Sequence, residues 1–280
     1  MKRLAKNLLN EALKPLGAKI VRRRKTDELG GAHDLGPPKG IDLGVHSASP
    51  LMLHSEMSLR EWSYYHSSAV LGVPRSDEYE RGPIRMKYHG IPIRKNPLDL
   101  WIYQEVIFDL KPDLIIEIGS AHGGSTLWLA HQLDLLGNER GKVLSLDIDR
   151  TPYLASHRRI VELTGDSSTP EVVRQVKAHR ESASVVLICH DGNHTAEGVL
   201  RDLRAYADMV TPDSYFIVED GLGDVKRTWG DSQYAGAGGP LNAVLEFLKE
   251  RGDYQIDYDK ERYILTQNNL GFLRRSGQEE

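Results

Sequence analysis

The strongest constraint on the fold is a regular alternation of short apolar runs and helix-like segments from residue 98 onward. Apolar runs bounded by glycine or polar residues predict buried strands. The segments between them repeat apolar residues at helical spacing, which predicts amphipathic helices. Strands that alternate with helices favour right-handed crossovers and a mostly parallel sheet with helices on both faces. The sequence therefore predicts a doubly wound α/β domain.

Residues 98–280 provide the elements of this domain. The predicted strands are Leu114–Gly119, Val143–Ile148, Ile160–Leu163, Val185–Cys189, Tyr215–Val218, Tyr254–Tyr258 and Arg262–Thr266, with Gly271–Arg274 as an extension of the last. The predicted helices are Leu98–Leu110, Ser125–Leu136, Pro170–Ala178, Ala196–Met209 and Pro240–Lys249. Because no helix separates the final strands, we expect them to form an antiparallel hairpin at one edge of the sheet.

The N-terminal part of the chain has a different character. Residues 1–25 hold nine Lys or Arg side chains against one acid, Glu11, with leucines at helical spacing. Such a basic amphipathic helix suits an anionic membrane surface or a partner; packing on its own domain or a second subunit is the alternative. We therefore expect a basic helix and irregular linker over 1–60, a helical or lid segment over 61–97, and the main domain over 98–280.

Composition limits the classes of function. The net charge of −4 disfavours a general nucleic-acid binder, which needs a basic surface. No apolar run reaches the roughly 18 residues of a membrane span, and no apolar signal region begins the chain. A single cysteine, Cys189, excludes an internal disulfide framework and is expected to be buried in a strand. We expect a cytoplasmic protein, and peripheral contact with a membrane is a second possibility for it.

In open α/β sheets, ligands bind beyond the carboxyl ends of the strands. The first strand runs into a glycine-rich turn, and its candidate cofactor residues are Glu117, Gly119, Ser120, Gly123 and Ser125. Ala121 stands where a dinucleotide-binding loop has the glycine that lets a pyrophosphate approach. This disfavours NAD and FAD but fits S-adenosylmethionine, which has no pyrophosphate. A plain tight turn is the alternative.

The next two strands also end in polar residues. Asp147 and Asp149 follow the second strand, where an acid can accept hydrogen bonds from ribose hydroxyls. Asp166 and Ser167 follow the third strand in a turn that suits an adenine edge, although a capping cluster for the next helix is the alternative. Three successive strands that end in such residues are a more specific sign of a nucleoside site than any one strand end alone.

The fourth and fifth strands carry the strongest signal. Asp191 follows the fourth strand, and Glu219 and Asp220 follow the fifth. Adjacent strands lie roughly 4.8 Å apart, and three carboxylates at one place repel unless a cation lies between them. Oxygen ligands favour Mg²⁺ or Mn²⁺. We therefore predict Asp191, Glu219 and Asp220 as metal ligands; solvated loop acids or helix caps are the alternative.

His194 lies three residues beyond Asp191, where a neutral imidazole could take a proton from a substrate hydroxyl. The alternative is a histidine that bonds the backbone at a helix start. His190 is expected to be structural. The glycine-rich residues 221–239 are long for a loop in a compact domain and are expected to cover the substrate; a disordered surface loop is the alternative.

The segments Ile116–Ser125, Leu146–Asp149, Gly165–Val173, Asp191–Thr195, Ser214–Asp220 and Gly271–Arg275 resemble class I S-adenosylmethionine-dependent methyltransferases. More closely, they resemble the cephalosporin hydroxylase and rhamnosyl O-methyltransferase family. The resemblance covers about residues 95–275 and implies a Rossmann-like fold of seven strands. It also implies Mg²⁺ on Asp191, Glu219 and Asp220, with Asp191 also in a catalytic and cofactor-binding role and His194 as the base. Relatives are often oligomeric, so a homo-oligomer is expected.

The resulting prediction is a metal-assisted O-methyltransferase that acts on a hydroxyl of a sugar, a glycan or glycolipid, or a natural-product small molecule. Two alternatives stay open at this point. One is a nicotinamide-dependent oxidoreductase on a Rossmann fold, which the missing glycine and the clustered acids disfavour. The other is a non-catalytic binding protein, in which the joint presence of the acids and His194 would be unexplained.

Overall fold

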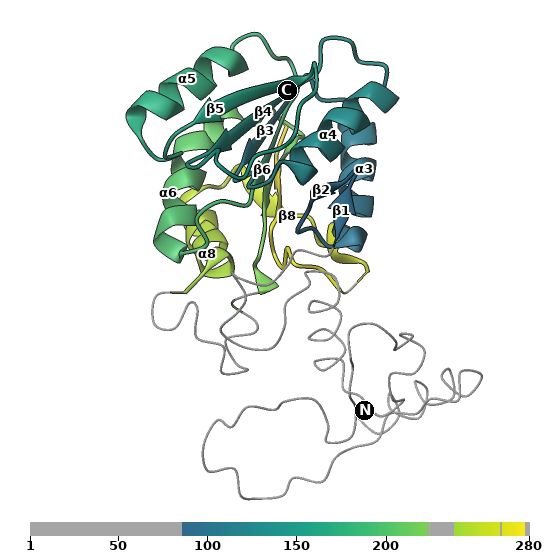
Figure 1. Ribbon diagram of the computed structural model, residues 1–280. Coiled ribbons are helices and arrows are strands. Elements are labelled where there is room, and N and C mark those ends of the chain that lie inside the picture. The colour runs from purple at the N-terminus through teal and green to yellow at the C-terminus, as the bar shows by residue number, and fades with distance from the viewer. Residues whose placement is uncertain (1–85, 223, 225–237, 264, 278–280) are drawn as a thin grey trace, which may run out of the picture. The chain divides into compact units, whose positions relative to one another are not determined.

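The computed structural model of the protein describes residues 86–222, 224, 238–263 and 265–277. In these ranges a seven-stranded sheet lies between two layers of helices (Figure 1). The basic segment 1–25, the linker up to residue 60, the first part of the segment 61–97 and most of the loop 221–239 lie outside the described residues. Their expected roles therefore stay predictions.

The sheet has the strand order β5-β4-β3-β6-β7-β9-β8. Its members are β3 (Leu114–Ile118), β4 (Lys142–Asp147), β5 (Ile160–Thr164), β6 (Val186–His190), β7 (Tyr215–Val218), β8 (Tyr254–Ile256) and β9 (Phe272–Arg275). The first five strands of this order are parallel to their neighbours, whereas β9 is antiparallel to both β7 and β8. The predicted doubly wound sheet with an antiparallel edge is confirmed.

The predicted helices are present with small shifts of their ends. They are α3 (Pro97–Leu110), α4 (Gly124–Leu135), α5 (Pro170–Arg180), α6 (Ala196–Tyr206), which continues into the 3₁₀ turn η3 (Ala207–Met209), and α8 (Pro240–Glu250). Asn96, Thr169 and Thr195 begin three of them, because each side chain accepts a backbone N–H of the first turn. Helix α8 lacks such a cap of its own, and the Asp224 carboxylate accepts from Gly239 N instead at 2.6 Å.

Alternate residues of the strands face two separate halves of the core. Ile116 and Ile188 pack with side chains from α5, α6 and α8 on one face of the sheet. Ile115 and Cys189 pack with side chains from α3 and α4 on the other. Since both faces are covered, the central strands read as continuous apolar runs. The expectation that Cys189 is a buried strand residue is confirmed.

Two segments differ from the predicted elements. Arg262–Thr266 is not a strand in its described residues; a 3₁₀ turn, η5 (Tyr258–Glu261), precedes it, and β9 supplies the strand that pairs with β8. The described part of 61–97 forms no helix before Pro97, but contains a small antiparallel hairpin of β1 (Lys87–Tyr88) and β2 (Ile91–Pro92). No described helix has the length and apolar character needed to cross a bilayer.

Candidate functional site

The carboxyl ends of the parallel strands meet at one edge of the sheet. Ile118 at the end of β3 is in register with Leu146 of β4 and with His190 of β6. His190 is in turn in register with Val218 of β7. The residues that directly follow these strands are therefore neighbours in space, as the sequence predicted.

Glycine is required where the loop after β3 approaches the next strand end. Gly119 has φ of 86°, and a Cβ there would lie 2.1 Å from the Asp191 carbonyl oxygen. Gly124, the first residue of α4, packs against the hairpin, because a Cβ there would lie 2.4 Å from the Pro92 carbonyl oxygen. The loop can therefore turn tightly and leave the N-terminus of α4 open, where free N–H groups favour polar or anionic ligand atoms.

A pocket of about 560 Å³ lies over these strand ends. This volume falls within the range of small-molecule sites. Its wall includes most of the predicted cofactor residues: Gly119, Ser120, Ser125, Asp147, Asp166, Ser167 and Asp191. Ile148, whose side chain is largely exposed, also lines the pocket and offers it an apolar surface. The pocket thus joins the polar ends of five strands in one continuous space.

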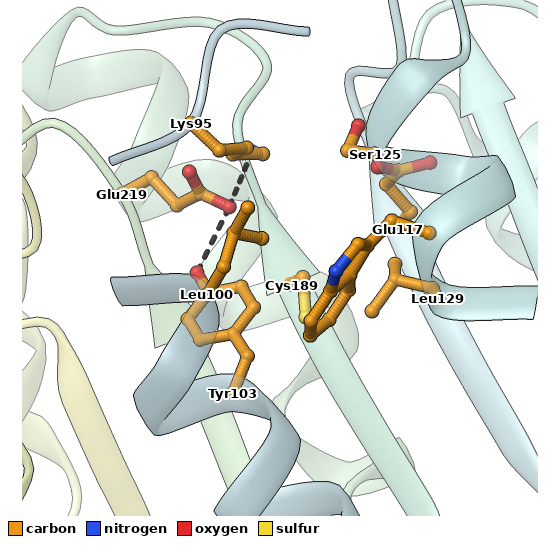
Figure 2. Close-up of a pocket in the computed structure, with 9 residues that line it drawn as sticks. Lys95, Leu100, Tyr103, Glu117, Ser125, Leu129, Cys189 and Glu219 are labelled. Atoms are coloured by element: carbon orange, nitrogen blue, oxygen red, sulfur yellow. Dashed lines mark hydrogen bonds and ion pairs between the residues drawn. The ribbon is translucent and has the colours of Figure 1, made fainter. Parts of the chain in front are cut away.

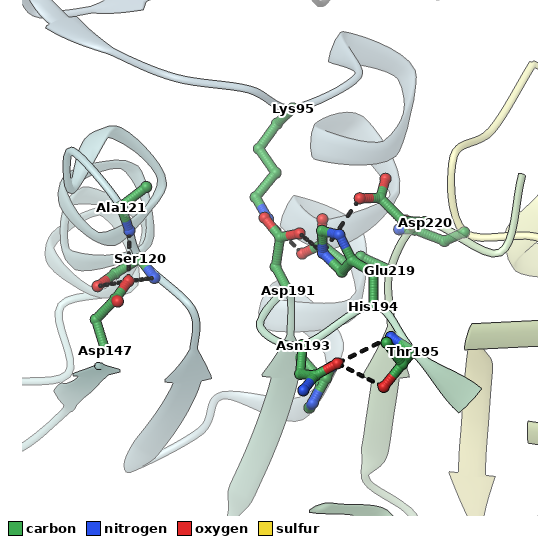
Figure 3. A network of polar contacts seen from close by, with 12 residues as sticks. Lys95, Ser120, Ala121, Asp147, Asp191, Asn193, His194, Thr195, Glu219 and Asp220 are labelled. Atoms are coloured by element: carbon green, nitrogen blue, oxygen red, sulfur yellow. Dashed lines mark hydrogen bonds and ion pairs between the residues drawn. The ribbon is translucent and has the colours of Figure 1, made fainter. Parts of the chain in front are cut away.

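The acids after β4 have separate surroundings. The Asp147 carboxylate accepts the backbone N–H groups of Ser120 and Ala121, both at 2.7 Å, and so fixes the glycine loop (Figure 3). Asp149 is exposed, is not among the residues that line the pocket, and accepts from Thr151 N at 2.8 Å. The structure therefore places Asp147, but not Asp149, at the predicted nucleoside site.

The polar residues after β5 lie at the pocket wall and also organise it. Asp166 accepts Ser168 N at 2.9 Å within the turn, whereas Thr169 is the residue that caps α5, and Asp166 also borders the pocket. Ser167 donates to the Asp202 carboxylate at 2.7 Å, and Asp202 also bonds Nε2 of the buried His190 at 2.9 Å. The structural role expected for His190 is thus to connect β6 with this loop through α6.

Two of the predicted glycine-loop residues lie behind the pocket. Glu117 is buried within β3, and one of its carboxylate oxygens accepts the Thr126 hydroxyl. Gly123 caps α4 in the left-handed region, and neither residue is part of the pocket wall. Their contribution is to hold the loop and helix start, and direct contact with a cofactor stays a prediction.

At the other end of the pocket, Asp191, His194 and Asp220 converge. Nε2 of His194 lies 3.3 Å from both Asp191 Oδ1 and Asp220 Oδ2 (Figure 3). One ligand atom from each of the three residues lies within 4.8 Å of the others, which is close enough for all three to reach one metal ion. Asp220 adopts a left-handed φ of 62°, and such conformations cluster at functional sites. Sequence analysis did not foresee His194 as part of this ligand set.

Glu219 belongs to a second group of contacts, which is built around Lys95. Its Oε1 is 2.6 Å from the Lys95 ammonium, and Lys95 also contacts Asp191 Oδ2 at 2.7 Å. The Tyr103 hydroxyl donates to the same Glu219 oxygen at 2.9 Å, and the cluster is packed against Cys189 and α3 (Figure 2). Asp220 leaves β7 in a left-handed conformation, and its carboxylate contacts His194, whereas that of Glu219 contacts Lys95.

Charge and burial shift the proton affinities in this cluster. Burial favours the neutral imidazole, but the carboxylates of Asp220 and Asp191 outweigh it and raise the pKa of His194 to about 9. Burial alone would raise the pKa of Asp191, yet Lys95 and His194 hold it well below its usual range. Burial raises the pKa of Glu219, the Lys95 ammonium offsets this only in part, and the Asp191 carboxylate raises it further. The two carboxylates therefore favour the protonated form of the His194 imidazole.

The residue that sequence reasoning missed is Lys95. It is only 6% exposed and reaches the acids from the segment between β2 and α3. Nothing in its local sequence distinguishes it from a surface lysine before a helix start. Its partners lie far along the chain, and only the fold brings them together.

A doubly wound sheet with a nucleoside-sized pocket over its carboxyl ends defines a Rossmann-like fold. In agreement, a solved CmcI structure described with Mg and SAM superposes with a TM-score of 0.55 at 19% identity, covering 79% of this chain and 86% of that chain. The CmcI apo-structure gives a TM-score of 0.54 at 19% identity, with 79% and 85% covered. At this level of identity, the similarity concerns the fold.

Sequence comparison gives the family. The model of the rhamnosyl O-methyltransferase/CmcI family matches residues 83–276. A rhamnosyl O-methyltransferase of Mycobacterium leprae (strain TN) is 30% identical over 192 residues, which is 66% of this chain and 81% of that protein. One of Mycobacterium tuberculosis (strain H37Rv) is 28% identical over 196 residues, 68% of this chain and 78% of that protein. The chain belongs to this family, and the predicted class, an S-adenosylmethionine-dependent O-methyltransferase, is confirmed.

Proposed function

We propose that the protein methylates a sugar hydroxyl with the help of a divalent cation, with His194 as the general base. The observation that carries this proposal is one pocket of small-molecule size that reaches the ends of β4 and β5 and has the Asp191, His194 and Asp220 group at its other end. A methyl donor at the first end and an acceptor hydroxyl at the second would be neighbours. The mycobacterial relatives named as rhamnosyl O-methyltransferases support a sugar as the acceptor.

The donors fit a hard cation. Asp191 and Asp220 present carboxylate oxygens within one ion's reach, and Glu219 supplies a third carboxylate beside Asp191. Oxygen-rich donor sets favour Mg²⁺ or Mn²⁺. When bound, such a cation would lower the pKa of a coordinated hydroxyl and neutralise the carboxylates that hold the His194 proton. We assign Asp191, Glu219 and Asp220 as its ligands.

In the proposed reaction, the acceptor oxygen forms a bond to the methyl carbon while the bond between that carbon and the sulfonium sulfur breaks. The acceptor hydroxyl loses its proton to Nε2 of His194, which faces the pocket between Asp191 and Asp220. The Asp147 carboxylate holds the loop after β3 in shape through Ser120 and Ala121. The protein therefore contributes mainly alignment and proton removal.

The test is transfer of a radiolabelled methyl group to p-nitrophenyl rhamnoside and related glycosides, with Mg²⁺ or with EDTA. We expect His194→Ala to lower kcat by about 10²- to 10⁴-fold, the usual contribution of a general base. Asp191→Asn and Asp220→Asn should abolish the response to Mg²⁺. The matched controls are His179→Ala on the exposed surface of α5 and Asp149→Asn outside the pocket wall, and both should keep normal rates.

The proposal has separable parts. Full activity in EDTA and in the Asp191 and Asp220 variants would remove the cation from the mechanism. A normal rate in His194→Ala would remove the base. If the wild-type protein methylates none of the glycosides but still binds S-adenosylmethionine in a calorimeter, the proposal of a sugar acceptor would be rejected.

A further inference from the structure

Lys95 occupies the position between two carboxylates that are assigned to the cation. Its Nζ is 2.7 Å from Asp191 Oδ2 and 2.6 Å from Glu219 Oε1, and its side chain is 6% exposed (Figures 2 and 3). Both distances are those of charge-assisted hydrogen bonds. A positive charge therefore already lies where two of the three acids meet, before any metal is added.

The backbone that delivers Lys95 is fixed. The next residue, Asn96, is buried and caps α3 by accepting Leu98 N at 3.0 Å. The Asn96 amide also donates to the carbonyl oxygen of Leu265 at 2.5 Å. Because Asn96 fixes the chain directly after Lys95, the lysine side chain, rather than the backbone, is the part that can adjust to a second cation.

The charges in this cluster explain why a resident cation is needed. Asp191, Glu219 and Asp220 lie together, and the buried Glu117 adds a further carboxylate that acts on Lys95. Carboxylates held this close together cost stability when no counter-ion lies between them. An ammonium bridging Asp191 and Glu219 removes much of this cost while the protein is free of metal.

We propose that Lys95 is a built-in counter-ion that competes with the divalent cation for Asp191 and Glu219. It holds the acids together in the metal-free protein and, by the same contacts, weakens the affinity for metal. This inference rests on the proposed metal function. It assigns Lys95 as a positioning residue that sets how tightly the site holds its cation, so that metal release stays possible.

The experiment measures Mn²⁺ affinity of the full chain by electron paramagnetic resonance, and its melting temperature in EDTA and in Mn²⁺. Lys95→Met keeps the length of the side chain and removes its charge. We expect Mn²⁺ to bind roughly tenfold more tightly, since a competing positive charge has been removed. The melting temperature in EDTA should fall, and the gain on adding Mn²⁺ should exceed that of the wild type.

The matched control is Lys142→Met on β4, where an exposed lysine donates its ammonium N–H to the carbonyl oxygen of Arg158. It should leave Mn²⁺ affinity unchanged. If Lys95→Met does not fold, Lys95→Gln keeps hydrogen-bond donors without the charge and should show the same direction.

The outcomes separate this inference from the function on which it rests. Mn²⁺ affinity in the Lys95 variants that is equal to or weaker than that of the wild type overturns the competition while leaving the metal site intact. A wild-type protein that binds no Mn²⁺ overturns both the metal assignment and the role of Lys95. Activity assays are not needed for either decision.

Discussion

At the scale of single residues, Asp99 shows that the fold retains a costly charge beside the site. It is buried in the first turn of α3 and accepts Gln267 N at 2.9 Å. Burial raises the pKa of Asp99 to about 6, and the bonds from Thr266 and Gln267 only partly offset this. When folding raises the pKa of an acid, the acid costs no stability at a pH where it is protonated in both the folded and the unfolded protein. The cost is greatest at a pH where it is ionised in both.

We therefore expect Asp99→Asn to be more stable than the wild type at pH 7.5, by about 1 to 2 kcal/mol. This value allows for some loss of the favourable contact with the helix N-terminus. The difference should shrink as pH falls from 6 to 4, where the wild-type carboxyl takes up its proton. Urea unfolding at several pH values checks this, with the exposed Glu162→Gln on β5 as the control. A constant difference across this range would contradict the charge argument.

The same scale shows how far the site could be predicted. Asp191, His194 and Asp220 come shortly after the ends of predicted strands, and the fold brings their side chains together. Glu219 also follows a strand end, but its side chain lies with Lys95 and Tyr103. That Glu219 follows a strand end was available from the sequence, whereas its partners were not, because they belong to α3 and the segment before it.

At the scale of elements, the β1–β2 hairpin is attached to α4 through histidines. The Tyr88 hydroxyl lies 2.9 Å from His131 Nδ1, and the His131 ring packs edge-on against those of His89 and His157. Asp134 faces the group and pairs with His157, Arg158 and Arg159. Burial lowers the pKa of His131, and the neighbouring His157 and His89 lower it further.

Folding lowers the pKa of this histidine below its value of about 6.5 in the unfolded protein. As pH falls below about 6.5, the unfolded protein therefore binds the proton first, and the folded state loses stability. We expect acidification from pH 7 to 5.5 to loosen the hairpin, seen as faster amide exchange of residues 87–92. His131→Gln keeps a hydrogen-bonding side chain without this titration and should show a smaller change. The exposed His179→Gln serves as the control. Equal pH dependence in the two variants would argue against this role for His131.

Elements also mark the limit of sequence-based prediction. Arg262–Thr266 has the aromatic and β-branched residues of a strand, yet in its described residues the backbone forms a hydrogen bond to the start of α3 instead of to a neighbouring strand. The Leu265 carbonyl accepts from the Asn96 amide, and Gln267 N donates to Asp99 just beyond it. The positions of the helices could be predicted from the periodic spacing of their apolar residues, because this spacing reflects burial of one helix face. The pairing of the last strands places β9 between β7 and β8, an order along the whole sheet that local patterns do not encode.

At the scale of the whole molecule, β9 joins the parallel body of the sheet to its edge. It pairs with β7 through Phe216 and Leu273 and with β8 through Ile256 and Leu273. Phe272 is fully buried and packs edge-on against Tyr103 of α3. The strand thus supports the helix that also holds Glu219 in place.

We expect Phe272→Ala to lower the free energy of unfolding by about 3 to 5 kcal/mol, the usual cost of removing a buried aromatic side chain. The matched variant Ile256→Ala, half-buried on the edge strand β8, should cost about 1 kcal/mol. Chemical denaturation followed by tryptophan fluorescence measures both. Similar losses in the two variants would contradict the interior role of β9.

The placement of β9 also constrains the order in which the nascent chain can complete its sheet. On the ribosome, β7 emerges before α8 and β8, but its outer edge pairs only with β9, which is synthesised after all of them. The β8 strand cannot join the sheet until β9 lies between it and β7. Translation must therefore pass residue 275 before the edge beside Glu219 and Asp220 is closed.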